Sequence, residues 1–238
     1  MSAIRRSVIA SFADKYLSQV IAVATLAVMS RILTPAEIGV YMLANTVILL
    51  ADNLRLFGIG TYIVQARDLD RAAIRCAFTV TLVVSIGVVL GVNLAAFRIS
   101  EFFRAPELAH LVGISTLAFC VLPFGAPIVA LLQRELAFTA LAWMNVAAAC
   151  INAAVTIALG ATGFGPASYV WGFVAASAAA TIMAILFRPD LWIFRPSFFG
   201  VGRILSFGAL SSSVTLINTV YDLLPRLALG RLLGVDSQ

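Results

Sequence analysis

The strongest information about the fold lies in residues 111–187, which read LVGISTLAFCVLPFGAPIVALLQRELAFTALAWMNVAAACINAAVTIALGATGFGPASYVWGFVAASAAATIMAILF. This stretch contains only two charged residues, Arg134 and Glu135. A helix that crosses the roughly 30 Å hydrocarbon layer of a bilayer needs about 20 apolar residues. The stretch therefore predicts three consecutive membrane-spanning helices. They cover residues 111–132, 136–161 and 163–187.

The composition of the whole chain is typical of a membrane protein. Of its 238 residues, 62% are hydrophobic and 11% are charged, and the mean hydropathy is +1.03. Soluble domains carry about 45–50% apolar and about 25% charged residues, so this chain has too little polar surface to face water on all sides. These values exclude soluble enzymes, disulfide-rich secreted domains and disordered tails.

Further apolar stretches lie outside this block. Residues 76–97 contain no charged residue and predict another span. Three other stretches are apolar but are interrupted by charged residues. They cover residues 8–30, 38–57 and 204–229. We therefore predict an all-α polytopic membrane protein with about seven transmembrane helices, because backbone groups left unpaired in lipid are too costly for other structures of this length.

The loops predict how the chain is organised and oriented. Residues 1–187 form a predicted six-helix N-terminal bundle, and residues 188–203, with two prolines and three arginines, form a predicted basic linker. If the spans alternate across the membrane, ten arginines lie on the N-terminal side and five on the other. Basic residues accumulate in cytoplasmic loops, so we expect a cytoplasmic N-terminus and linker. The net charge of +5 then requires no nucleic-acid partner.

The last predicted helix is similar to the first. A Ser-Phe-Ala or Ser-Phe-Gly motif opens both, at residues 11 and 206, and an Arg-Ile-Leu or Arg-Leu-Leu motif follows both, at residues 31 and 231. Parallel six-helix repeats are a known plan of membrane transporters. We expect residues 204–238 to hold the first helix of a second bundle that is incomplete in this chain. The 238 residues would then be about half of a longer protein.

Three short motifs resemble those of the polysaccharide-synthesis flippases, a family within the multidrug/oligosaccharidyl-lipid/polysaccharide exporter superfamily. They are RILTPAEIGVY at residues 31–41, GIGTYIVQ at residues 58–65 and GRLLG at residues 230–234. The resemblance implies two bundles and a carrier that moves lipid-linked oligosaccharide or polysaccharide precursors, including those of lipopolysaccharide, across the bacterial inner membrane by alternating access. It implies the lipid bilayer and the lipid-linked substrate as partners, H⁺ or Na⁺ as coupling ion, and no cofactor or metal.

Polar side chains inside the spans are the candidate functional residues. An ionisable group in a span costs a few kcal/mol and therefore usually faces a bundle interior or a water-filled cavity. We predict that the substrate is bound by Lys15, Gln19, Asn45, Arg55, Asn145, Asn218 and Arg226. We predict that the coupling ion is bound by Asp14, Asp52 and Asp222. The basic members suit a diphosphate, because a guanidinium group binds two phosphate oxygens and a lysine supplies a mobile charge.

Structural roles are the alternative for several of these residues. Asp14 and Lys15 lie near the expected cytoplasmic end, where both side chains can extend to the interface. Asp52 lies three residues before Arg55 and can form a local pair with it, and the last helix holds a similar pair four residues apart. For Asn145 a hydrogen bond between helices is favoured over binding of sugar hydroxyls.

The loops contain no enzyme motif. GxSxG, HExxH and a glycine-rich phosphate loop do not occur in the sequence, and the longest predicted loop, residues 98–110, holds one histidine. We therefore predict no catalytic residues, and a membrane-embedded glycosyl-transfer enzyme is a weaker alternative. A multidrug antiporter of the same superfamily is the main rival, because three basic and three acidic residues in the charged helices balance each other. A non-functional truncated fragment is the third alternative.

Overall fold

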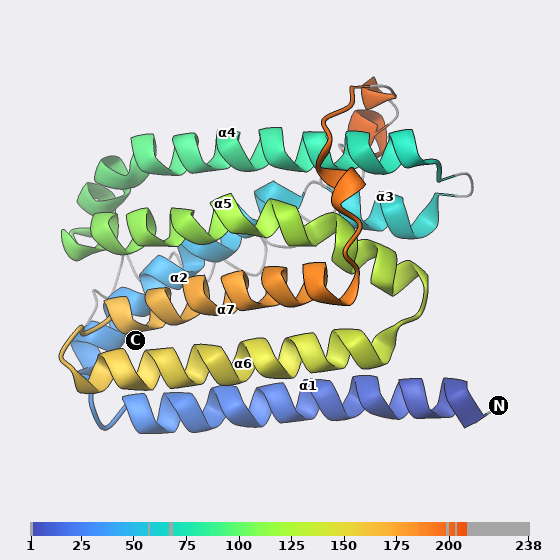
Figure 1. Cartoon of the computed structure of the whole chain (residues 1–238). Helices are drawn as coiled ribbons and strands as arrows, with labels where there is room; N and C mark the ends of the chain where they lie inside the picture. The colour runs from blue at the N-terminus through green and yellow to red at the C-terminus, as the bar shows by residue number, and fades with distance from the viewer. Residues whose placement is uncertain (1, 57, 67–68, 199, 203, 209–238) are drawn as a thin grey trace.

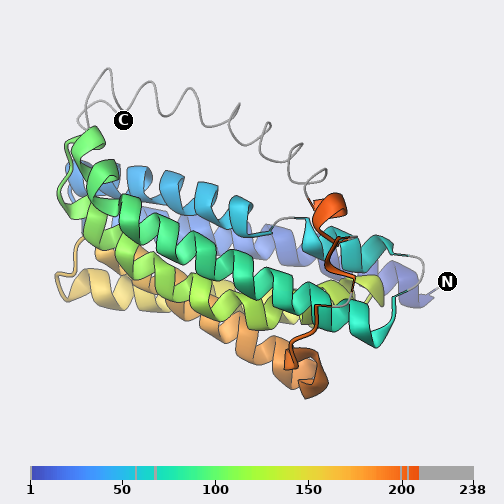
Figure 2. The same ribbon diagram turned by 90° about the horizontal axis from the view of Figure 1, so that it is seen from above.

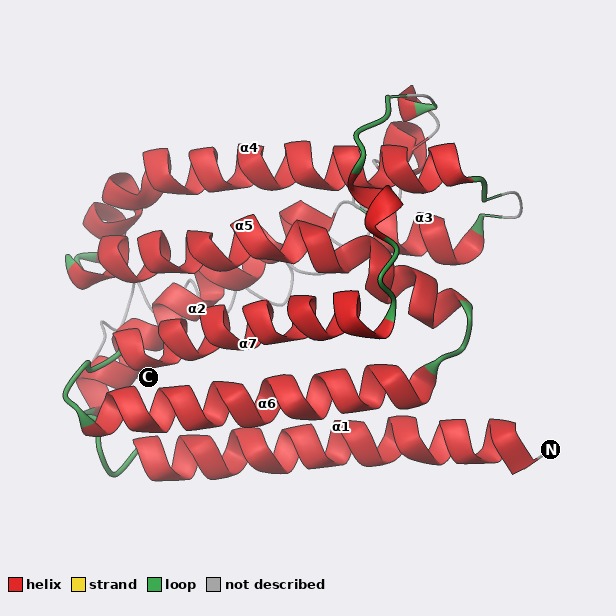
Figure 3. Ribbon diagram, in the orientation of Figure 1, coloured by secondary structure: helices red, strands yellow, loops and turns green. Residues whose placement is uncertain are grey.

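The structure is a computed structural model that describes residues 2–56, 58–66, 69–198, 200–202 and 204–208, with side chains from residue 14 onward. Within these residues all regular elements are helices (Figure 3). They are α1 (Ser2–Met29), α2 (Pro35–Leu56), α3 (Ile59–Gln65), α4 (Arg71–Phe103), α5 (Glu107–Arg134), α6 (Phe138–Ala161), α7 (Ala167–Phe187) and the 3-10 helix η1 (Leu191–Phe194).

Five of the described helices, α2, α4, α5, α6 and α7, are long and apolar enough to cross a membrane. The chain is therefore an all-α, multi-pass membrane protein, as its composition predicts. The predicted helix over residues 8–30 is observed as α1, and its role as a span stays a prediction. Of the predicted helix over residues 204–229, only residues 204–208 are described, and these are helical. The total of seven spans therefore also stays a prediction.

Two features differ from the sequence-based expectation. The predicted loop over residues 98–110 is almost entirely helical, because α4 continues to Phe103 and α5 begins at Glu107. Hydropathy reports how much of a helix lies in lipid, and polar residues allow the same helix to continue into the interface. The second feature is α3, which follows α2 directly and was not predicted. It begins after Gly58, whose φ of 62° lies in the left-handed region that glycine tolerates.

The long helices lie side by side with roughly parallel axes. In Figure 1, α4, α5, α7, α6 and α1 form one layer from top to bottom. The view from above (Figure 2) shows α2 on one side of this layer, where it packs against α5 and α4. Because α1 packs against α6 instead, the first two helices separate and leave part of α6 and α7 between them.

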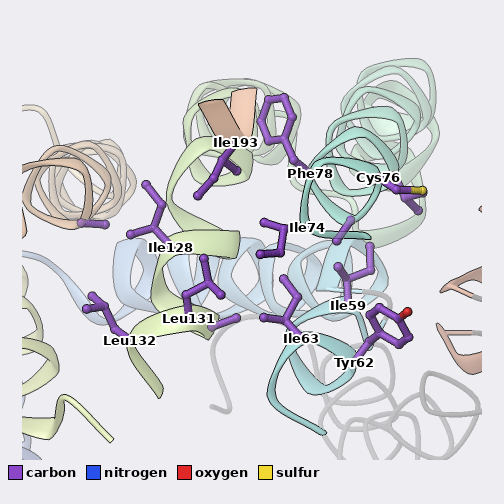
Figure 4. Packing of buried hydrophobic residues seen from close by; sticks show 14 of the residues in the cluster. Ile59, Tyr62, Ile63, Ile74, Cys76, Phe78, Ile128, Leu131, Leu132 and Ile193 are labelled. Carbon is purple, nitrogen blue, oxygen red and sulfur yellow. The ribbon is translucent and has the colours of Figure 1, made fainter. Parts of the chain in front are cut away.

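The buried core connects the short elements at one end of the bundle. Figure 4 shows side chains of α3, α4, α5 and η1 pointing toward one another, among them Ile63, Ile74, Phe78, Ile128, Leu131 and Ile193. Phe78 and Phe124 both contact Phe194, with ring centroids 5.4 and 5.7 Å apart. The segment after α7 is therefore packed into the core of the bundle at this end.

The same segment is bound to α4 by polar contacts. Nε of Arg75 donates to the carbonyl oxygen of Arg195 at 2.9 Å, and the backbone N–H of Ser197 donates to Oγ1 of Thr79 at 2.9 Å. The guanidinium group of Arg71 lies 5.4 Å from the ring centroid of Trp192, within cation–π range. This part of the predicted linker thus has a defined position on the six preceding long helices.

Candidate functional site

The guanidinium group of Arg55 is buried in the last turn of α2, where its side chain is 4% exposed. Its Nε and Nη2 atoms donate to Oδ1 of Asp52 at 3.0 and 2.8 Å, which is the local pair expected from the spacing. Its Nη1 atom is also buried but has no hydrogen-bond partner within the described part of the chain. A buried charged donor without an acceptor is costly, so this position is suited to an anionic ligand.

A cavity of about 250 Å³ is lined by Arg55 at the end of α2 and by residues of α3, α4, α5 and α7. Its polar lining consists of Arg55, Thr81, Gln133 and Thr181, and Arg55 is the one charged residue among the described residues that line it. The Oγ1 atom of Thr181 is buried and likewise has no partner in the described structure. We call this space the Arg55 cavity. It combines one buried cation with hydroxyl and amide groups in an otherwise apolar wall.

Close contact between α5 and α7 places the Thr181 hydroxyl in this wall. A Cβ atom added at Gly125 would lie 3.0 Å from Oγ1 and 3.2 Å from Cα of Thr181. A side chain at position 125 would require Thr181 to move by a few tenths of an ångström. Gly60 lies on the α3 side of the cavity, and a Cβ atom there would meet nothing within 4 Å. The cavity therefore has open space next to α3 and a tight helix contact on its α7 side.

Two further cavities are lined by residues of α2, α6 and α7; one, of about 420 Å³, is also lined by α1, and the other has a volume of about 150 Å³. Tyr41, Asn152 and Tyr169 line both of them. The rings of Tyr41 and Tyr169 are stacked, with centroids 4.1 Å apart and planes 12° from parallel. The hydroxyl group of Tyr169 is buried and has no partner among the described residues. These three residues form a shared wall, which we call the tyrosine wall.

The structure separates the predicted site residues that it describes into four groups. Arg55 lines the Arg55 cavity, whereas Asn45 and Asp52 line the smaller cavity beside the tyrosine wall. Lys15 and Gln19 are exposed on α1 and do not line any of these three cavities. The predicted residues of the last helix lie outside the described residues; they are Asn218, Asp222 and Arg226.

Asp14 and Asn145 are bound to each other. Nδ2 of Asn145 on α6 donates to Oδ2 of Asp14 on α1 at 2.8 Å. Oγ of Ser18, one turn along α1, lies 3.4 Å from the other carboxylate oxygen and donates to it. This is the hydrogen bond between helices that the sequence favoured for Asn145, and its acceptor is a carboxylate predicted to bind the coupling ion.

Sequence reasoning assigned no binding role to several residues that line these cavities. Tyr41 lies within the motif at residues 31–41, and Tyr169 lies near the start of a helix made mostly of small and apolar residues. A tyrosine near a helix end is often an interfacial residue, so the sequence alone did not indicate a cavity. Nothing in the sequence indicated that Thr181 lines a cavity, because threonine in a span commonly bonds to the backbone of its own helix.

Comparison with known proteins identifies the family. A sequence profile described as "Polysaccharide biosynthesis protein" matches residues 28–237. This chain belongs to the polysaccharide biosynthesis protein family. The resemblance seen in the short motifs is thereby confirmed. The matched region of this polysaccharide biosynthesis protein contains the Arg55 cavity and the tyrosine wall, whereas Asp14 and Lys15 precede it.

Curated relatives in this family are similar to the chain at low identity. The lipopolysaccharide biosynthesis protein WzxC of Escherichia coli (strain K12) is 28% identical over 87% of this chain and 42% of WzxC. The succinoglycan biosynthesis transport protein ExoT of Rhizobium meliloti (strain 1021) is 23% identical over 90% of this chain and 43% of ExoT. The chain thus spans about two fifths of the length of these relatives. No solved structure matches the chain.

Proposed function

We propose that this chain is part of a carrier that moves lipid-linked oligosaccharide or polysaccharide precursors across the bacterial inner membrane by alternating access. Membership of the polysaccharide biosynthesis protein family supports a role in polysaccharide biosynthesis. Similarity to a transport protein of succinoglycan biosynthesis supports transport as the activity. The structural observation that carries the proposal is Nη1 of Arg55, a buried donor without an acceptor in the described structure, beside a cavity. A diphosphate supplies the missing acceptor oxygens.

The surroundings of Arg55 suit a reversible anion site. Asp52 bonds to one side of the guanidinium group and stabilises its charge when the cavity holds only water. The partial negative charge of the helix C-terminus likewise stabilises the cation of Arg55 in the last turn of α2. The apolar walls strengthen any charge interaction inside the cavity, and its volume of about 250 Å³ exceeds the roughly 30 Å³ occupied by one water molecule.

The charge of this cavity favours a polysaccharide carrier over a multidrug antiporter. A pump for cationic drugs needs an acidic cavity, whereas the charged residue that lines the described Arg55 cavity is basic. A carrier works by changing conformation and makes no covalent bond, so the proposal assigns no catalytic residue and no enzyme activity. The proposal also places the carrier in the inner membrane, with its N-terminus in the cytoplasm.

The other predicted residues have subordinate roles in this proposal. Lys15 and Gln19 are exposed on α1 and would contact substrate on the side where the second bundle is expected. Asp14 and Asp52 are proposed to bind H⁺ or Na⁺. The last helix, the seventh proposed span, would complete the cavity with a third carboxylate and two further polar groups; these residues are Asp222, Asn218 and Arg226.

Binding of a short lipid diphosphate tests the proposal directly. The chain in phosphatidylethanolamine and phosphatidylglycerol nanodiscs is titrated with farnesyl diphosphate and with farnesol, which lacks the charged group. We expect tighter binding of the diphosphate, and a loss of roughly tenfold or more in Arg55→Gln, the size of one charge-assisted hydrogen bond. Arg98→Gln removes an exposed arginine of α4 and serves as the control.

A test in cells uses the gene that encodes this chain. We expect Arg55→Glu to abolish export of surface polysaccharide at normal protein level, because a carboxylate repels the diphosphate. Equal binding of diphosphate by the wild type and a folded Arg55→Gln variant, together with unchanged export in Arg55→Glu, would exclude the proposed role of Arg55.

A further inference from the structure

The tyrosine wall is a pre-formed polar surface that the anion site at Arg55 does not use. Stacking at 4.1 Å holds the rings of Tyr41 and Tyr169 in fixed positions between the cavities of about 420 and 150 Å³. The larger volume lies within the range of about 300–1,000 Å³ that is common for small-molecule sites. The wall therefore offers a rigid surface with open space beside it.

Several hydrogen-bonding groups on or beside this wall have no partner among the described residues. The side chain of Tyr169 is 8% exposed, and its hydroxyl group has no partner in the described part of the chain. Asn152 accepts a hydrogen bond from Thr156 at 3.4 Å through Oδ1, which leaves its two amide N–H donors. Asn45 adds a second side-chain amide to the smaller cavity. A buried hydroxyl without a partner costs free energy, so a ligand that bonds to it is favoured.

The chemistry of this wall matches a neutral compound with many hydroxyl groups. Each sugar hydroxyl both donates and accepts a hydrogen bond, and the residues that line the two cavities include two phenols, two carboxamides and a carboxylate. The described residues that line these two cavities include no lysine, arginine or histidine. A phosphate group would therefore find no positive charge here, in contrast to the Arg55 cavity.

We propose that the tyrosine wall binds the sugar next to the diphosphate of the lipid-linked precursor. The inference rests on the proposed function, because it takes the diphosphate to bind at Arg55. Asp52 connects the two positions: its Oδ1 atom accepts both bonds from Arg55, and its side chain lines the smaller cavity beside Tyr169. In this proposal the sugar attached to a diphosphate at Arg55 lies against the tyrosine wall, where the Tyr169 hydroxyl and the amides of Asn45 and Asn152 bind its hydroxyls.

Paired probes separate sugar binding from diphosphate binding. The chain in the same nanodiscs is titrated with farnesyl diphosphate and with its N-acetylglucosaminyl and galactosyl derivatives. We expect the wild type to bind at least one glycosylated probe more tightly than farnesyl diphosphate. Tyr169→Phe should reduce this preference roughly two- to tenfold, the contribution of one neutral hydrogen bond, and leave the affinity for farnesyl diphosphate unchanged. Asn45→Ala should reduce the preference by a similar factor.

Tyr169→Phe is a mild substitution, because it removes only a hydroxyl group that has no protein partner in the described structure. Tyr16→Phe is the matched control, since Tyr16 is 71% exposed on α1 and lines neither of the two cavities. The inference is overturned if neither sugar increases wild-type affinity, or if both substitutions preserve the preference. If the proposed function itself is wrong, the experiment gives a different result: the wild type and Arg55→Gln bind farnesyl diphosphate equally well.

Discussion

Asn145 on α6 donates a 2.8 Å hydrogen bond from Nδ2 to Oδ2 of Asp14 on α1, although 131 residues separate them in sequence. The bond joins α1, at the edge of the layer, to its neighbour α6 (Figure 1), and Asp14 lies near the middle of α1. The bond also occupies one oxygen of a carboxylate proposed to bind a coupling ion. The bond is therefore a structural link whose strength can be measured separately from transport.

A double-mutant cycle measures this link. We expect Asp14→Ala and Asn145→Ala to be coupled by about 0.6 kcal/mol and at most ~1.7 kcal/mol, the range found for hydrogen bonds between membrane helices. The free energy of unfolding of the chain in nanodiscs is the quantity to compare. The exchanged pair Asp14→Asn with Asn145→Asp should restore most of the stability. Additive single effects would show that the two side chains do not interact in the membrane.

Arg134 binds the C-terminal end of α3. Its Nη1 atom donates to the carbonyl oxygens of Ile63, Val64 and Ala66, at 2.8, 3.3 and 2.6 Å. A cation at a helix C-terminus is favourable, because the last carbonyl groups of a helix have no intrahelical partner. We predict that Arg134→Leu destabilises the chain by about 1–2 kcal/mol and speeds amide hydrogen exchange over residues 59–66.

Arg134→Lys tests whether geometry matters in addition to charge. A lysine keeps the positive charge but has one donor group in place of a planar fork, so protection of α3 should be intermediate. Arg98→Leu, on the exposed surface of α4, provides the control. Unchanged exchange over residues 59–66 in Arg134→Leu would mean that α3 is held by its apolar contacts alone.

Gly172 on α7 allows close packing against α6 next to Asn152, a residue of the tyrosine wall. A Cβ atom at this position would collide with Oγ1 of Thr156 and lie 3.0 Å from the backbone oxygen of Asn152. We predict that Gly172→Ala destabilises the chain by about 1–3 kcal/mol, as overpacking typically does, with partial recovery in the double variant with Thr156→Ala.

The matched control for this substitution is Gly91→Ala on α4, where an added Cβ meets nothing within 4 Å. It should be neutral or stabilising by up to about 1 kcal/mol, because alanine is the better helix former. Thermal unfolding of the two variants in the same nanodiscs compares them. Equal stability of Gly172→Ala and Gly91→Ala would contradict the close contact between α6 and α7.

Asp190 gives the segment after α7 a defined pH dependence. Its carboxylate accepts a 2.6 Å hydrogen bond from Nε of Arg188, which also pairs with Glu135. This hydrogen bond lowers the pKa of Asp190 below its ordinary value of 3.8. A carboxylate with a lowered folded-state pKa stabilises the protein above the ordinary pKa, and this contribution is lost as pH falls through the lowered pKa.

Comparison with Asp190→Asn checks this dependence. We expect the wild type to be more stable than the variant by a constant amount from about pH 5 to pH 7, and this difference to shrink below about pH 4. The measurement is the difference in melting temperature across a pH series. A difference that stays constant down to pH 2, or that grows as pH falls, would be inconsistent with the Arg188–Asp190 interaction.

Several features of the fold follow from the sequence because they depend on neighbouring residues. Charge-free stretches of membrane-spanning length identify α4, α5, α6 and α7 whatever their packing partners. The pair of Asp52 and Arg55 follows from the helical repeat, which brings residues three apart onto one side. The helical part of the expected loop over residues 98–110 was missed because hydropathy marks the lipid boundary and not the end of a helix.

The candidate site likewise contains features that the sequence predicts and features that it does not. A basic residue in an apolar stretch is enough to indicate Arg55 as a cavity residue, since an ionisable group in a span needs a polar environment. Its isolated Nη1 atom, the Thr181 hydroxyl beside it and the stacked pair of Tyr41 and Tyr169 were not predictable. Each depends on which helix lies next to which, and hydropathy says nothing about that.

Amino-acid order alone is enough to establish that this chain is a helical membrane protein with charged groups inside its apolar stretches. The packing of the helices then settles which polar groups of the described residues are hydrogen-bonded within the protein and which are not. Asp14 is bonded by Asn145 across two helices, whereas Nη1 of Arg55 has no partner in the described structure. The two levels differ because helix formation depends on hydrogen bonds four residues apart, whereas satisfaction of a buried side chain can depend on neighbours more than a hundred residues away.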